Sequence, residues 1–242
     1  MRHASKTDQA FLEQYDPSAF ERPSVTVDVA LLSPKDGALW TLLAQRQEPP
    51  FKDAWGLPGG FIQMNESLDA AAARVLREKA GVKGIFLEQL FTFGETERDP
   101  RMRIISVAYY ALIPPEKLAR AAESTQLARI NVPWEGETGG PVVAEDANGK
   151  SFPLPFDHDE ILGMAVKRVR GKLDYTPIGF ELLPQEFTLS DLQHVHEIVS
   201  GRHLNKDSFR RRMLASDQLE PTGEAREGTA HRQPALFRRK KN

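Results

Sequence analysis

One segment, residues 57–82, constrains the fold of this chain more than any other. It opens with a proline and two consecutive glycines, which predict a loop where the backbone can approach a ligand closely. Residues 67–80 then contain no glycine or proline and are rich in alanine, so they predict a helix that ends at Gly81. Because Arg74 and Glu78 are four residues apart, this helix presents both side chains on one face.

The spacing of the charged residues and glycines in this segment resembles the Nudix box. That motif reads Gly, five residues, Glu, seven residues, Arg-Glu-apolar-any-Glu-Glu, one residue, Gly-apolar. Two of its acids are missing here, because Val75 and Lys79 stand where glutamates belong. The positions that fit the motif are Gly60, Glu66, Arg74, Leu76, Glu78, Gly81 and Val82.

The two replacements bear on the chemistry that the resemblance implies. Nudix enzymes use carboxylates on this helix to hold divalent cations, which activate water for attack on a diphosphate. A lysine ammonium about 4 Å from a unit positive charge costs roughly 4 kcal/mol at an effective dielectric constant of about 20, and a divalent ion doubles that cost. The sequence therefore predicts a Nudix scaffold that binds a ligand without cleaving it, with no catalytic residue, no metal site and no cofactor.

Around this segment the sequence predicts an α/β fold. A β-branched run at residues 25–32 and a second largely apolar run at 39–46, separated by a Pro-Lys-Asp-Gly turn, predict a hairpin. Because strands and helices do not alternate regularly, we expect a Nudix-like α/β/α sandwich with a mixed sheet over residues 1–172. The first 20 residues are polar and are expected to be loosely held. Further strands are expected at residues 85–93 and 103–113, helices at 117–129 and 158–171, and a loop at 131–150.

Several residues of this first domain are candidates for contacts with an anionic ligand. Arginines can hold diphosphate oxygens in bidentate hydrogen bonds, although a surface ion pair explains any single arginine equally well. Phe51 and Trp55 can stack on a nucleobase, but core packing is the commoner fate of such residues. The predicted effector-binding residues are Arg46, Gly59, Gly60, Glu66, Glu78, Arg98, Arg101 and Arg103.

The C-terminal part, residues 173–242, differs in charge and in pattern. Residues 201–242 hold eleven Lys and Arg against five Asp and Glu, although the whole chain has a net charge of -2. Thr188 and Asn205 each precede a helical pattern, and two extended pieces around a glycine-rich turn follow. This order is typical of a winged helix-turn-helix domain, and a protein-interaction module with a basic face is the alternative. The predicted DNA-binding residues are Lys206, Ser208, Arg210, Arg211, Arg212, Arg226, His231 and Arg232.

Composition narrows the cellular setting. The chain has no cysteine, which excludes disulfides, thiolate metal sites and a thiol nucleophile. No apolar run reaches the roughly 18 residues that a membrane span needs, and the N-terminus has no apolar signal core. We therefore expect a cytoplasmic protein without a membrane partner.

Together the two halves resemble the Nudix-related transcriptional regulators of NAD metabolism. The likeness includes PFKDAWGLPGGF before the box helix, FDHDEIL in the connecting helix, and GFELLPQEFTLSDLQ, KDSFRRR and LEPTGE in the C-terminal part. It implies a homodimeric repressor that binds palindromic double-stranded operator DNA. It also implies that ADP-ribose, or a related NAD metabolite, is sensed in the Nudix-like pocket. From the fusion of the two parts we expect effector binding to shift the angle or spacing of the two winged helices across the dimer.

Two other functions are compatible with the sequence alone. The first is an active Mg-dependent ADP-ribose pyrophosphatase with a C-terminal appendage, in which a loop glutamate replaces the missing base. The second is an RNA- or protein-binding adaptor, which has no preference for one DNA duplex over another.

Overall fold

The computed structural model describes residues 5–118, 124–226 and 233–240. Within them, a nine-stranded mixed sheet forms the body, in the order β5-β6-β1-β2-β7-β8-β9, with β3 paired to β2 and β4 to β1. β1 and β6 run parallel, whereas β1 and β2 form the predicted antiparallel hairpin. The strands of this sheet are β1 (Ser24–Lys35), β2 (Ala38–Gln45), β3 (Trp55–Gly56), β4 (Gly59–Phe61), β5 (Phe86–Phe93), β6 (Ile104–Leu112), β7 (Thr125–Asn131), β8 (Val143–Glu145) and β9 (Ser151–Phe152).

The alternation of side chains along β1 separates two apolar layers. Val29 and Leu31 pack under α2 (Leu68–Val75), whereas Ala30, between them, packs toward α4 (His158–Lys172). Successive residues of a strand point to opposite faces, so one fully buried strand supports a helix on each side of the sheet. The predicted α/β sandwich with a mixed sheet is confirmed.

The box helix begins and ends where the sequence predicts. The Ser67 hydroxyl accepts a hydrogen bond from the Ala70 N–H at 3.2 Å, which caps α2. The helix continues through a π-helical turn (Leu76–Ala80) and ends at Gly81, whose φ of 69° is left-handed. Val75 lies on the inner face of this helix, is 1% exposed and packs in the apolar layer between the helix and the sheet.

One predicted helix is wrong. Residues 125–129 of the helix expected over 117–129 belong to strand β7, and a single helical turn, α3 (Pro115–Leu118), precedes it. β7 pairs with β2, with Trp40 opposite Arg129 and Ala44 opposite Thr125. The hydrogen bonds and apolar contacts offered by β2 outweigh the weak helical preference of an Ala- and Arg-containing segment. The expected loop at 131–150 likewise contains a short strand, β8.

The C-terminal part has the predicted helix, turn, helix and hairpin. Thr188 and Asp191 form a capping box at the start of α5 (Leu189–Ser200), and the Asn205 side chain accepts from the Ser208 N–H at the start of α6 (Lys206–Ala215). The order of elements is that of a winged helix. The remaining elements are a 3₁₀ helix (Pro177–Leu182) and the strands β10 (Phe187–Thr188), β11 (Leu219–Ala225) and β12 (Ala235–Arg239).

The apolar core continues from the body into the winged helix. Val169 of α4, Leu192 and Val199 of α5 and Phe209 of α6 belong to the same buried cluster as Leu32 of β1. α4 therefore joins the two parts by packing as well as by chain connection. The boundary at residues 172/173 stays a prediction.

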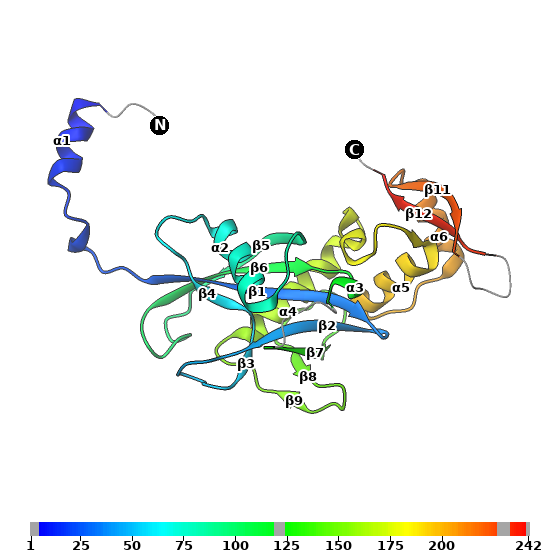
Figure 1. Cartoon of the computed structure of the whole chain (residues 1–242), viewed down its shortest axis with the longest axis horizontal. Coiled ribbons are helices and arrows are strands. Elements are labelled where there is room, and N and C mark those ends of the chain that lie inside the picture. Colours follow the sequence, from blue (N-terminus) through cyan, green and yellow to red (C-terminus); the bar gives the residue numbers. More distant parts are fainter. Residues whose placement is uncertain (1–4, 119–123, 227–232, 241–242) are drawn as a thin grey trace.

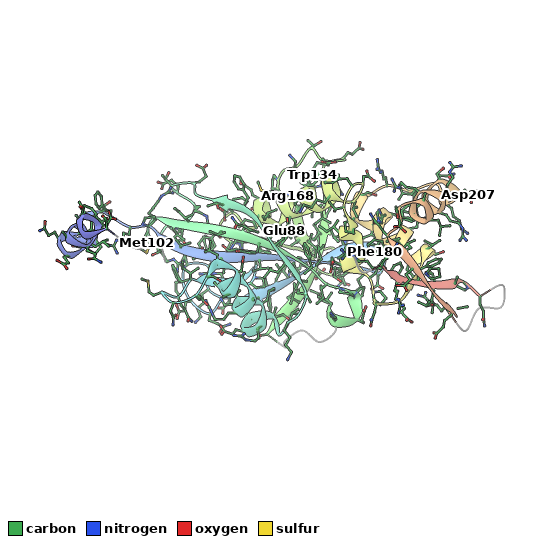
Figure 2. The ribbon with its side chains drawn as sticks, turned by 90° about the horizontal axis from the view of Figure 1, so that it is seen from above. Glu88, Met102, Trp134, Arg168, Phe180 and Asp207 are labelled. Carbon is green, nitrogen blue, oxygen red and sulfur yellow. The ribbon has the colours of Figure 1, made fainter. Side chains whose placement is uncertain are left out.

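The N-terminal segment, expected to be loosely held, forms α1 (Lys6–Gln14), which Ser5 and Asp8 cap as a capping box. α1 stands apart from the body, and Phe11 and Leu12 are both 63% exposed (Figure 1). Seen from above, α1 lies at one end of an elongated molecule and α6, marked by Asp207, lies at the other (Figure 2). None of the described helices has the length and apolar character to cross a membrane.

Candidate functional site

A buried carboxylate organises the end of the sheet where the box glycines lie. Asp28 stands in the middle of β1, and its Oδ2 accepts a hydrogen bond from the Ser106 hydroxyl at 2.5 Å. β4 pairs with β1 here, with Gly59 opposite Asp28. A Cβ at Gly59 would lie 1.9 Å from Asp28 Oδ1, so only glycine fits beside this carboxylate. Gly60 is less constrained, since its Cβ would make an ordinary contact of 3.6 Å with Val75.

Arg98 is held in a buried ion pair beneath this site. Its Nε and Nη2 donate to the two carboxylate oxygens of Asp157 at 2.8 and 2.6 Å, and Nη2 lies 3.7 Å from Asp28 Oδ2. The Arg98 side chain is 4% exposed. Burial alone opposes its charge, but the hydrogen bonds to Asp157 and the charge of Asp28 prevail and raise the pKa of Arg98.

His158 completes this polar floor in its neutral form. Its Nδ1 accepts a hydrogen bond from the Leu57 N–H at 3.0 Å, and its Nε2 lies 3.7 Å from Asp28 Oδ1. Burial lowers the pKa of His158 despite the nearby carboxylates. The first residues of α4 are thereby tied to the loop that enters the box and to the central strand.

Aromatic and cationic side chains gather above this floor. The Arg46 guanidinium lies 4.8 Å from the ring centroid of Phe156, and the Arg101 guanidinium lies 6.0 Å from Phe156 and 5.8 Å from Phe61. The Phe51 ring meets Phe156 edge-on at 5.0 Å. Phe51 and Phe156 have left-handed φ values of 62° and 58°, and such strained backbone clusters at ligand-binding sites.

The two cations of this aromatic cluster differ in how they are neutralised. Arg101 donates to both oxygens of Asp99 at 3.0 and 2.8 Å, and these bonds raise the pKa of Arg101. Arg46 donates to the Pro50 carbonyl at 2.9 Å and, among the described residues, forms no ion pair with a carboxylate. Burial, and then the charge of Arg101, lowers the pKa of Arg46. An anion entering here meets at least one unneutralised guanidinium.

The remaining box acids are both held by one arginine. Arg74 donates to Glu66 through Nε at 3.0 Å and through Nη2 at 2.6 Å, and it donates to Glu78 through Nη1 at 3.3 Å. Glu66 also accepts from the Gln63 N–H at 2.8 Å. The hydrogen bonds from Arg74 lower the pKa of Glu66. Arg74 and Glu78, predicted to share one face of the helix, are therefore in direct contact.

These residues do not fit the divalent cation that the Nudix fold implies. A hard cation needs several free carboxylate or carbonyl oxygens, whereas Glu66 and Glu78 are already bound to Arg74. Val75 is buried in the core, and Lys79 brings a positive charge. In the described ranges, no group of three or more His, Asp and Glu could hold a metal ion.

On the winged helix, α6 presents an exposed basic surface. Lys206, Arg210 and Arg211 are exposed, and none of them forms an ion pair within the described part of the chain. Arg212 is exposed as well, but it lies 3.2 Å from an oxygen of Asp174. The opposite face is fixed by Phe209, which is 3% exposed.

The other predicted DNA-binding residues have varied positions. The Ser208 backbone N–H is used by the Asn205 cap, while its side chain is exposed. Arg226 donates to Asp191 at 3.1 Å and so is tied to the start of α5. His231 and Arg232 lie outside the described residues.

Comparisons with known proteins decide the family. Residues 22–135 match the model of the NUDIX domain, and residues 179–239 match the model of the NrtR DNA-binding winged helix domain. The "ADPR responsive transcriptional repressor NtrR" of Acinetobacter baylyi is 37% identical over 235 residues, which are 96% of this chain and 88% of that protein. The chain belongs to the NrtR family.

Solved structures of the NrtR family agree in fold. Shewanella oneidensis NrtR in complex with a 27mer DNA has a TM-score of 0.73 and 33% identity, covering 89% of this chain and 93% of that one. The NUDIX domain of the same NrtR, crystallised with ADP ribose, has a TM-score of 0.52 and 31% identity, covering 67% of this chain and 98% of that one.

Within this NrtR-family structure, the predicted effector residues separate into groups. Arg46 and Arg101 meet at Phe156, as does Phe51, whereas Trp55 packs against the core. Arg98, Glu66 and Glu78 are engaged by other side chains of the chain itself. Arg103 is exposed where β6 begins, and its carbonyl accepts from the Ser24 N–H.

Asp28, Phe156, Asp157 and His158 are site residues that the sequence did not predict. Asp28 had a signal, since it is an acid inside a β-branched run that is otherwise apolar. Phe156, Asp157 and His158 stand in the FDHDEIL segment, which carries the family resemblance but no local chemical motif. Their partners Arg46 and Arg98 lie far away in the sequence, so no local pattern joins them.

Proposed function

We propose that this chain is a DNA-binding transcriptional repressor of NAD metabolism genes that senses ADP-ribose or a related nucleotide metabolite in its Nudix-domain pocket. The observation that carries the proposal is the course of α4. Its N-terminus follows Phe156 and holds Asp157 and His158 in the pocket floor, and its C-terminus packs on the winged helix. One rigid element thus touches both functional sites, which is what coupling between them requires. We propose that this protein acts in the cytoplasm.

The proposed effector contacts are narrower than the set predicted from sequence. Arg46 and Arg101 supply donors for diphosphate oxygens, and Phe51 and Phe156 supply aromatic faces for a base. Gly60 leaves room beside β4. We assign Arg98 to the pocket floor and not to the ligand, because its Nε and Nη2 donors are already bound to Asp157.

Arg170 is the proposed junction between α4 and the winged helix. It donates to the Val199 carbonyl at the end of α5 at 2.8 Å and to the Gly136 carbonyl at 3.1 Å. Its guanidinium lies 4.8 Å from the Trp134 ring, which Figure 2 shows beside α4. Burial lowers the pKa of Arg170. A small rotation of α4 therefore moves α5 through these bonds.

A cavity of about 320 Å³ lies at the same junction, between the β2–β7 part of the sheet and α5. It is lined by Leu39, Asn131, Arg170 and Ile198, among others. We propose that this cavity gives the two domains room to move and does not bind the effector. No aromatic residue is among those that line it, and Arg129 in its lining is already paired with Glu145.

The effector is proposed to leave the pocket uncleaved. A Nudix hydrolase needs free carboxylates for its metal, and here Arg74 holds Glu66 and Glu78. Incubation with ADP-ribose and Mg²⁺ or Mn²⁺, followed by chromatography, is expected to give no AMP. Turnover that disappears in the Glu78→Gln variant would instead establish the chain as an ADP-ribose pyrophosphatase.

The central experiment measures DNA binding against effector. A labelled duplex from upstream of the chain's own gene is titrated with protein, with and without ADP-ribose, and fluorescence anisotropy is recorded. We expect tight binding at moderate salt and a change in affinity of roughly 5- to 150-fold with ADP-ribose, the usual range of allosteric coupling. AMP plus ribose 5-phosphate is the matched control. An affinity that ignores millimolar ADP-ribose would refute the proposed effector.

Two protomers are expected on each operator. A winged helix reads a half-site of a few base pairs, and palindromic operators place two half-sites at fixed helical spacing. Light scattering of the free protein and of the complex measures the stoichiometry. One protomer per duplex at saturation would contradict the homodimer.

A further inference from the structure

We propose that the diphosphate of the effector is neutralised by the chain's own Lys79 and Arg46 in place of a divalent cation, so that binding does not depend on metal. This inference rests on the proposed function and adds how the same site recognises its ligand. It follows from the position of Lys79, from the charges around it and from the state of the box acids.

The fold brings the turn that carries Lys79 close to the strands of the proposed effector site. Lys79 follows Val75 by four residues, and it lies in the π-helical turn that ends the box helix. A Cβ at Gly60 on β4 would lie 3.6 Å from the Val75 side chain, and the adjacent Gly59 pairs with Asp28 of β1. The turn that carries Lys79 also packs against β2, and Arg46 directly follows that strand.

The electrostatic environment agrees with that position. Much of Lys79 is exposed, yet surrounding protein atoms desolvate its ammonium and lower the pKa of Lys79. Asp28 and Glu78 oppose this shift, whereas the charges of Arg46 and Arg74 add to it. The ammonium of Lys79 thus senses the same Asp28 and Arg46 that define the pocket.

The cations of the site differ in whether the chain already neutralises them. Arg74 is paired with Glu66, Arg98 with Asp157, and Arg101 with Asp99. Within the described ranges, Arg46 and Lys79 form no ion pair. The charge of Arg46 at the aromatic cluster and the charge of Lys79 on the box helix therefore remain for a ligand. Each phosphate of a diphosphate diester carries about one negative charge.

A metal would work against this arrangement. In Nudix chemistry the divalent cation neutralises the phosphates, and carboxylates hold the cation. Here Arg74 occupies Glu66 and Glu78, and the Lys79 ammonium repels a divalent ion. The replacement of an acid by Lys79 removes a metal ligand and supplies the charge that the metal carried.

The test is calorimetric titration of the full chain with ADP-ribose in excess Mg²⁺ and in EDTA. We expect wild-type dissociation constants that agree within about twofold, and a loss of roughly 10- to 100-fold in Lys79→Gln under both conditions. Lys83→Gln is the matched control, because Lys83 is exposed just beyond the box helix, and it is expected to bind as wild type. Thermal unfolding of each variant checks that the fold is retained.

A second readout does not depend on affinity. Electron paramagnetic resonance of Mn²⁺ added with ADP-ribose is expected to show only the free ion. Binding that requires Mg²⁺, a bound Mn²⁺ signal, or an unchanged affinity in a folded Lys79→Gln variant would each overturn the inference and leave the proposed effector intact. Absence of wild-type binding under both conditions would overturn the proposed effector itself, and the inference with it.

Discussion

Replacement of Arg98 by methionine tests whether Arg98 stabilises the fold or binds the ligand. The Arg98 side chain is 4% exposed and donates two hydrogen bonds to Asp157, which is 15% exposed. Methionine retains the apolar volume but leaves the carboxylates of Asp157 and Asp28 without their cation. Removal of one partner of a buried pair typically costs about 3–5 kcal/mol. We expect the free energy of unfolding of the ligand-free protein to fall by that amount.

Urea unfolding followed by tryptophan fluorescence measures this loss in the relevant domain. All 3 tryptophans of the chain, at positions 40, 55 and 134, lie before the winged helix, so the signal reports the Nudix domain. Arg77→Met is the control, since Arg77 forms an exposed ion pair with Glu78 at 3.5 Å and is expected to cost less than about 1 kcal/mol. Asp157→Asn in the Arg98→Met background is expected to recover part of the loss, because it removes the unpaired charge.

The same pair of variants can refute the reasoning. If Arg98→Met is no less stable than Arg77→Met, the buried ion pair does not hold the pocket floor together. If its affinity for ADP-ribose falls sharply at unchanged stability, Arg98 contacts the ligand, as the sequence pattern alone predicted. The two measurements together assign Arg98 to one role.

Three further predictions concern the winged helix and its connection to the Nudix domain. Arg210→Gln and Arg211→Gln are each expected to make the slope of log affinity for DNA against log salt less steep by about one. Arg212→Gln is expected to change the slope by less, because Arg212 is already paired with Asp174. Fluorescence anisotropy at several salt concentrations measures these slopes. Burial lowers the pKa of His196 to about 4 from 6.5. The free energy of unfolding is therefore highest above about pH 6.5, and it decreases by up to about 3 kcal/mol as the pH falls toward 4, because the unfolded chain takes up the proton first. Calorimetry between pH 7 and pH 5 should show this decrease in wild type and a flatter profile in His196→Gln. Arg170→Gln is expected to bind ADP-ribose normally but to lose most of its effect on operator affinity, and full retention of that effect would show that coupling takes another route.

Short-range features of the fold could be predicted from the sequence because their causes lie within a few residues. Ser67, Thr188 and Asn205 cap helices through N–H groups three positions onward, and Gly81 ends the box helix in a left-handed conformation. The spacing of the box and the order of elements in the C-terminal part indicated both domains for the same reason.

The tertiary structure decided which partner each side chain and each strand received. Residues 125–129 became a strand because β2 was available to pair with them, although their own preference is helical. Arg98 and Asp157 are 59 positions apart, and Asp28 and Ser106 are 78 apart, so no local pattern announces either contact. Which arginines are neutralised, and which cations remain for a ligand, depends on these distant contacts. Backbone preference is encoded by neighbours in the chain, whereas charge compensation is set by neighbours in space.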